Sequence, residues 1–352
     1  MIGKTQKQTA EQNATAIQSA GDITVNTGVS LDQMKAIIEC VSDQIPKYAA
    51  IAREIVDQRL DDFKEKIINK FNSDNAANAN AFQDPDFQYL LSHSQQAYAR
   101  SGNATTADLL IDLIAQRSGT TTGERRSIIL NRAAEIVPLL TNQEISILMV
   151  TFLLRRVHFG AAKSPAALGS ILLNHIAPYV VDLSADEAPY LYLESLGCGK
   201  LSMGECGFVR ILASGYPEAV VTLPTLDALS TATSATFAQQ LFDAGLVKMS
   251  ADGSGVIKII EQNDDFVNAI KDCGFDENLA HQAFNILNYQ HPTLKEIISI
   301  LQPHVSMIER LANVWDNSPL KNLELSATGV AIGFTAAKGK SNFSGDICAW
   351  VN

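Results

Sequence analysis

The chain has 352 residues, which is long enough for two or three domains with a substantial core. Apolar residues make up 46% of it, as in ordinary globular proteins, but charged residues make up only 18%, which favours an oligomer whose subunits cover one another. The formal net charge of −11 repels phosphate backbones and argues against nucleic acid as a partner.

Cysteine usage and hydropathy favour a cytoplasmic protein. The five cysteines are an odd number and form no CxxC pattern, which predicts reduced thiols rather than a disulfide framework or a zinc site. The N-terminus has no apolar segment of the signal-peptide type. The longest apolar run, Ile145–Leu154, is half as long as a membrane-spanning helix, so we expect no span.

Residues 1–29 form a polar arm rich in Gln, Asn, Thr and Ala. A turn at Ser19–Asp22 precedes the alternating segment Ile23–Asn26, which predicts a short strand. So few apolar groups cannot offset the cost of ordering the backbone, about 1–2 kcal/mol per residue. The arm is therefore either disordered or a β element that pairs with copies of itself, and the candidate pairing residues are Ile17, Ile23, Val25 and Val29.

Residues 30–71 predict a helical stalk that begins at the N-cap residue Ser30. Apolar residues alternate at spacings of three and four, which is a heptad pattern: Leu31, Met34, Ile38, Val41, Ile45, Tyr48, Ala52 and Ile55. Pro46 predicts a kink or break between Asp43 and Pro46. Either the stalk multimerises, with Leu31, Met34, Ile38 and Val41 as further oligomerisation residues, or this segment is an amphipathic helix pair packed on its own domain.

Residues 72–83 are rich in Asn and Ala and predict a polar linker between the stalk and the body. The body over 84–180 begins at Asp84-Pro85, a helix start, and its first helix ends at Gly102. Further apolar segments with short connections follow as far as Ile176, and they predict antiparallel helices in a bundle.

Residues 181–352 predict a mixed, mainly α region. A hairpin is expected at 246–260, because Asp252-Gly253 separates two apolar segments after a helix. The order helix, strand, turn, strand is similar to the wing of a winged-helix module, although acidic residues surround its two lysines, Lys248 and Lys258. A structural or protein-contacting wing is therefore expected rather than a DNA reader.

The last part of the chain predicts one long helix over Leu294–Trp315 and another that begins at Ser326. Small residues in the latter permit close contact with a neighbouring helix. The alternating segment Asp346–Val351 predicts a C-terminal strand. The predicted fold class is thus mainly α: a helical-bundle body with a self-pairing β arm, a winged-helix-like hairpin and a C-terminal strand.

The search for chemistry yields no catalytic, cofactor-binding or metal-binding residue. No two histidines have metal-binding HxxxH spacing. Gly197–Lys200 resembles a phosphate loop only superficially, and Cys198 within it is either a reactive thiol or a buried one. The short basic groups Arg125-Arg126, with Arg132, and Arg155-Arg156 are typical of charged helical surfaces.

Three segments carry a family resemblance: the arm from Gln6 to Ile23, the stretch from Asp84 to Leu113, and the ending Leu325–Gly333. They resemble an uncharacterised bacterial family in which a Gln/Asn-rich arm precedes a long helix. More distantly, the body resembles the alpha-type abortive-infection proteins of phage defence, although Leu325-Ser-Ala-Thr-Gly departs from their Leu-Thr-x-x-Gly motif. The resemblance implies bacterial origin and an antiviral or stress function, and it implies no reaction.

We therefore expect a non-enzymatic, homo-oligomeric bacterial protein that is assembled partly through its arm and senses or binds a phage or host protein. The alternative is an enzyme, a hydrolase or nuclease effector whose site is assembled from residues scattered along the chain. A deep pocket that gathers carboxylates or histidines would favour this alternative.

Overall fold

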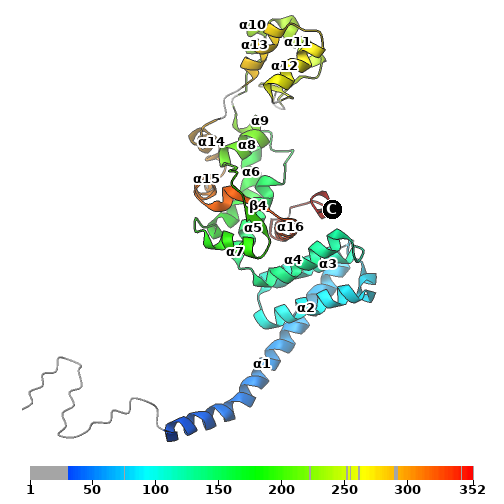
Figure 1. Cartoon of the computed structure of the whole chain (residues 1–352), viewed down its shortest axis with the longest axis vertical. Helices are drawn as coiled ribbons and strands as arrows, with labels where there is room; N and C mark the ends of the chain where they lie inside the picture. The colour runs from blue at the N-terminus through cyan, green and yellow to red at the C-terminus, as the bar shows by residue number, and fades with distance from the viewer. Residues whose placement is uncertain are drawn as a thin grey trace, which may run out of the picture. The chain divides into compact units, whose positions relative to one another are not determined.

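The fold is mainly α, as the sequence predicts (Figure 1). The computed structural model describes residues 31–74, 76–221, 223–250, 253, 255–260, 262–288, 292–341 and 343–351. The arm, with Ile17, Ile23, Val25 and Val29, lies outside these residues, so its pairing stays a prediction. The chain divides into two units between Val56 and Asp57.

Helix α1 (Leu31–Ser73) contains Pro46 and continues through it, so the predicted break is absent. The second half of the predicted stalk, residues 57–71, is part of the body rather than separate from it. Residues 57–73 of α1 belong to the second unit, where Phe63 and Ile67 are buried in the main core. The ring centroids of Phe63 and Tyr98 lie 5.6 Å apart.

The predicted linker over 72–83 is packed onto the body. It contains the 3-10 helix η1 (Ala79–Gln83), which is preceded by a hydrogen bond from Asn78 N–H to Ser118 Oγ of 2.9 Å. The ring of Phe82 lies 5.1 Å from that of Phe71 and 5.3 Å from that of Phe87. Packing of these aromatic rings against the core outweighs the polar composition that suggested a free linker.

The body begins with a bundle of helices. The predicted start and end signals lie at the two ends of its first helix. The side chain of Asp84 caps the first of them by accepting from Asp86 N–H, and Gly102 ends it with φ 61°. The elements are α2 (Pro85–Ser101), α3 (Ala104–Ser118), α4 (Arg125–Ile136), η2 (Val137–Leu139), α5 (Asn142–Arg155), α6 (Pro165–His175) and η3 (Ala177–Asp182). Apolar residues of α5 are buried along its whole length, which places it at the centre of the core.

The rest of the main core comes from chain segments that precede and follow a smaller lobe, residues 226–287. The elements are α7 (Ala188–Ser195), β1 (Gly199–Leu201), α8 (Phe208–Gly215), α9 (Pro217–Val220), α14 (Leu294–Leu301), α15 (Ile308–Asp316), η4 (Pro319–Asn322), β4 (Leu323–Leu325), α16 (Ala327–Ser341) and η5 (Ile347–Ala349). Strands β1 and β4 pair antiparallel, with Lys200 opposite Glu324, a pairing that the sequence analysis missed.

Helix α16 packs closely against α5, as its small residues predict. A Cβ on Gly333 would lie 2.6 Å from the carbonyl oxygen of Leu148, so only glycine permits this approach. Ser326 caps the helix by accepting from Gly329 N–H at 3.1 Å.

Two predicted elements near the C-terminus are wrong. The segment Leu294–Trp315 is two helices, α14 and α15, because Pro303 lies between them and cannot continue a helix. Residues 346–351 contain the 3-10 helix η5 rather than a strand. The ring of Trp350 packs 5.2 Å from that of Phe152, and its Nε1–H donates to the carbonyl of Arg156 at 2.9 Å, so side-chain packing fixes this segment without a partner strand.

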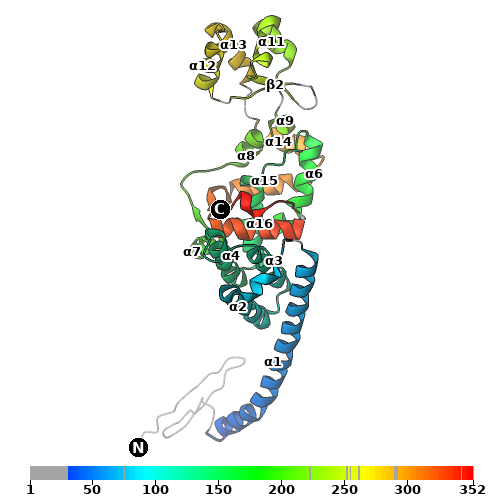
Figure 2. The same cartoon turned by 90° about the vertical axis from the view of Figure 1, so that its right-hand side faces the viewer.

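The smaller lobe has its own hydrophobic core. Figure 2 draws the helices of this lobe grouped together. It comprises α10 (Leu226–Ala232), α11 (Ala235–Asp243), β2 (Val247–Met249), β3 (Val256–Lys258), α12 (Asn263–Asp272) and α13 (Glu277–Leu287). Strands β2 and β3 form the predicted antiparallel hairpin. Among the described helices of the whole chain, none combines the length and hydropathy that crossing a membrane requires.

Candidate functional site

Large apolar side chains are exposed on the N-terminal part of α1. We call five of them the α1 seam: Met34, Ile45, Tyr48, Ile51 and Ile55. Their exposed fractions are 50%, 56%, 62%, 55% and 42%. Soluble proteins rarely expose contiguous apolar surface of this kind unless it serves an interaction.

The seam follows the heptad geometry of a coiled coil. Ile45 and Ala52 occupy a positions, Met34, Tyr48 and Ile55 occupy d positions, and Ile51 lies beside them at g. The b positions carry Pro46 and Arg53, and the c positions carry Lys47 and Glu54. Pro46 is therefore on the side of the helix away from the seam, which allows the apolar pattern to pass it.

The seam ends where the apolar pattern changes phase. From Val56 the pattern continues at Leu60, Phe63 and Ile67, one residue out of step with Ile55. One residue turns an α-helix by about 100°, so these side chains lie on another face of α1. Burial on that face increases along the helix, from Val56 at 36% exposed to Phe63 at 0% and Ile67 at 6%.

The predicted oligomerisation residues fall partly on this seam. Met34 lies in it. Leu31, Ile38 and Val41 lie within α1, but their side chains are outside the described part of the chain. Ile45, Tyr48 and Ile55 were not among the predicted oligomerisation residues. The same heptad spacing continues beyond Pro46 and could have identified them.

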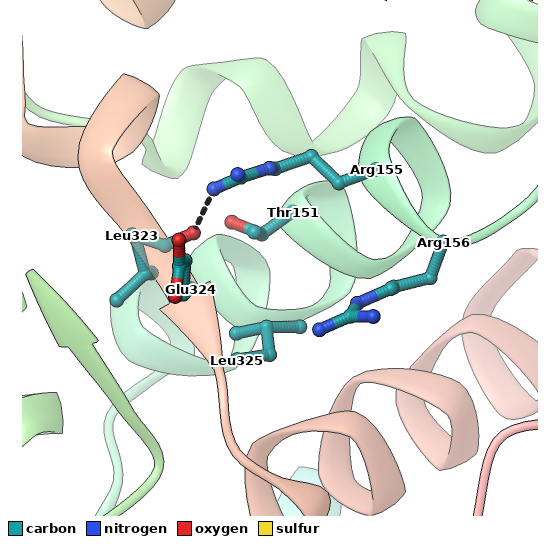
Figure 3. A pocket seen from close by; sticks show the side chains of 6 residues that line it. All are labelled: Thr151, Arg155, Arg156, Leu323, Glu324 and Leu325. Atoms are coloured by element: carbon teal, nitrogen blue, oxygen red, sulfur yellow. Dashed lines mark hydrogen bonds between the residues drawn. The ribbon is translucent and has the colours of Figure 1, made fainter. Parts of the chain in front are cut away.

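A polar pocket lies at the C-terminal end of α5 (Figure 3). It has a volume of about 350 Å³ and is lined by Thr151, Arg155, Arg156, Leu323, Glu324 and Leu325. The side chain of Arg155 donates to the carbonyl of Leu323 on β4. Figure 3 shows that the side chain of Arg156 also extends toward β4.

A second pocket of about 580 Å³ adjoins the first and shares Arg155 and Arg156 with it. Helix α8 adds Arg210 to its lining, and the loop after α5 adds His158, whose ring stacks on Tyr216 at 5.2 Å. No Asp or Glu lines this pocket. We call the two pockets together the arginine cleft.

The charges in the arginine cleft are unevenly paired. Glu324 pairs with Lys200 across β1 and β4 at 3.4 Å, and the charge of Lys200 is the largest influence that lowers the pKa of Glu324. Within the described part of the chain, no ion pair joins Arg156 or Arg210 to a carboxylate. The cleft is therefore positive in a chain whose net charge is −11.

The other predicted basic residues do not line the cleft. Arg132 pairs with Glu135 at 3.0 Å, as a charged helical surface predicts. Arg126 contacts the Sγ of Cys348 and lines a different pocket. Arg210 could not be identified from the sequence, because no local pattern connects it with Arg155-Arg156.

The Gly197–Lys200 segment has a structural role. Cys198 is 0% exposed, and burial raises the pKa of its thiol to about 12, so the reactive-thiol alternative is wrong. Its carbonyl accepts from Ser326 N–H at 3.0 Å, and the carbonyl of Gly197 accepts from Ser326 Oγ at 2.7 Å. The segment therefore holds the start of α16.

No group of three or more His, Cys, Asp or Glu side chains that could hold a metal ion occurs among the described residues. The hydrolase or nuclease alternative stays an untested prediction.

The comparisons with known proteins give one match. A model of an uncharacterised protein family matches residues 28–351. No curated protein and no solved structure matches the chain. The matched range includes the α1 seam and the arginine cleft, whereas residues 1–27 of the arm lie outside it. The resemblance to abortive-infection proteins has no support from these comparisons.

Proposed function

The chain belongs to the uncharacterised family whose model matches residues 28–351, and we propose that it is a non-enzymatic protein that self-associates through the α1 seam. The exposed seam is the observation that carries the proposal. A solvated helix derives little stability from intrinsic propensity, and in proteins most of it comes from packing an apolar face. The five described seam residues expose such a face instead of burying it.

A second copy of the chain is the partner that fits the seam best. Alternating a and d positions over successive heptads allow side chains of one helix to insert between those of an identical helix. The apolar g position at Ile51 widens the stripe. Charged side chains at b and c, such as Arg53 and Glu54, would stay in water when the seams pack together.

Light scattering coupled to size-exclusion chromatography tests the proposal. The full chain should elute as an oligomer that dissociates on dilution. The double variant Ile45→Asp/Ile55→Asp should have the mass of one chain, because paired seams would bury unpaired carboxylates. The matched control Arg53→Asp adds an acidic group to the opposite face and should stay oligomeric. A wild-type chain that is monomeric at all concentrations would contradict the proposal.

The arm and the body have separate tests. A chain that starts at Ser30 should show whether the arm adds to the association of the seam, since it keeps α1 and lacks residues 1–29. The sequence resemblance adds binding of a phage or host protein and a defence role to the proposal. Plaque counts on cells that produce the wild-type chain or Ile45→Asp/Ile55→Asp would test that role, and equal counts with and without the wild type would contradict it.

A further inference from the structure

The arginine cleft lies apart from the α1 seam in the sequence and has no part in the proposed self-association. We propose that it binds the phosphate groups of a small nucleotide. Arg155 and Arg156 come from the end of α5, and Arg210 comes from α8. All three line one pocket of about 580 Å³ that no carboxylate lines.

The charge balance in the cleft favours an anion. The three guanidinium groups are always ionised and carry three positive charges. The C-terminal end of α5 contributes only about half a negative charge. Glu324 lines the smaller pocket but is paired with Lys200 at 3.4 Å. The positive charge therefore exceeds the negative charge near Arg155 and Arg156.

The donors favour a phosphate over a single carboxylate. Arg155 is held in place by its hydrogen bond to the carbonyl of Leu323. Arg156 and Arg210 are exposed and have no ion-pair partner among the described residues, so their forked N–H donors can contact a ligand. Two such groups balance the two negative charges of a phosphate monoester, whereas one carboxylate would leave one of them uncompensated.

The aromatic pair beside the arginines favours a ligand with a planar base. The rings of His158 and Tyr216 stack with an interplanar angle of 6°, and His158 is exposed. The Tyr216 hydroxyl accepts from Phe159 N–H at 3.2 Å, which fixes the buried ring. A base can stack on such a surface. The pocket volume is also within the range of small-ligand sites, about 300–1,000 Å³.

Calorimetric titration of the full chain at low salt tests the proposal, with ADP, pyrophosphate, adenosine and a short single-stranded oligonucleotide as probes. We expect ADP to bind more tightly than pyrophosphate and adenosine not to bind. The double variant Arg156→Gln/Arg210→Gln should weaken ADP binding about tenfold or more. Both side chains are exposed, so the variant should fold, which its thermal unfolding would verify.

The control variant Arg53→Gln/Arg132→Gln removes the same number of positive charges, at exposed positions outside the cleft, and should bind ADP as the wild type does. The proposal is overturned if ADP does not bind, or if the cleft variant and the control lose the same affinity. Pyrophosphate binding as tight as that of ADP would overturn the part assigned to His158. An oligonucleotide that binds more tightly than ADP would assign the cleft to nucleic acid instead.

Discussion

The two ends of α1 contain apolar residues at similar spacing, yet their surroundings are opposite. Ile55 is 42% exposed, whereas Phe63, about two turns further along the same helix, is 0% exposed. Heptad spacing alone does not distinguish the two. The change of phase at Val56 does, because it turns the apolar face and coincides with the boundary between the two units. A change of phase in an apolar heptad pattern can therefore mark the point along a helix where the surface that it packs against changes.

The largest expected difference between the two ends is in the free energy of unfolding. Phe63→Ala should lower it by about 3–5 kcal/mol, because the substitution leaves a cavity in the main core. Tyr48→Ala should change the stability of the monomer by less than about 0.5 kcal/mol, since its side chain is 62% exposed. Chemical denaturation of dilute protein measures both, and equal losses would remove the distinction.

A smaller difference is expected between two arginines of α1. Arg59 donates to the carbonyls of Ala99 and Arg100 at 2.8 and 3.0 Å, at the C-terminal end of α2. Arg59→Ala should cost about 1–2 kcal/mol, because these carbonyls lose charged donors. The exposed Arg53→Ala is its control and should be nearly neutral in the same denaturation experiment. A neutral Arg59→Ala would mean that water replaces the arginine fully.

The smallest effect is expected for the ion pair between Lys66 and Asp108, whose atoms lie 2.9 Å apart. Asp108→Asn should cost less than about 1 kcal/mol because the pair is largely solvated. The hydrogen bond that the Lys66 ammonium donates to the Asp108 carboxylate is the largest influence on the pKa of Lys66 and raises it above 10.5. The contribution is therefore present at neutral pH and is lost as the pH rises through that raised pKa. Denaturation at neutral and strongly alkaline pH should show the difference between wild type and variant shrinking.

Local signals predicted much of the fold. Asp84-Pro85, Gly102 and Ser326 mark helix ends because each acts on its own backbone neighbours. The hairpin of β2 and β3 follows from a turn between two short apolar segments. The heptad spacing also predicted the helix of α1, but the helix continues through Pro46, where a kink or break was expected.

Features that join distant segments could not be predicted in this way. The pairing of Lys200 with Glu324, and the presence of Arg210 and Arg155 in the lining of one pocket, depend on tertiary packing that no local spacing encodes. The burial of Cys198 has the same origin, since its carbonyl is covered by the start of α16. The sequence therefore indicated the exposed seam better than it indicated the arginine cleft.

The contact between α16 and its neighbours has a consequence for how the sequence of this family can vary. A Cβ on Gly329 would lie 1.8 Å from the carbonyl oxygen of Cys198, and one on Gly333 would lie 2.6 Å from that of Leu148. Both obstacles are backbone atoms, which cannot move aside as a flexible side chain can. Adding one carbon atom at either position should therefore be tolerated less well than removing a whole ring from the exposed end of α1.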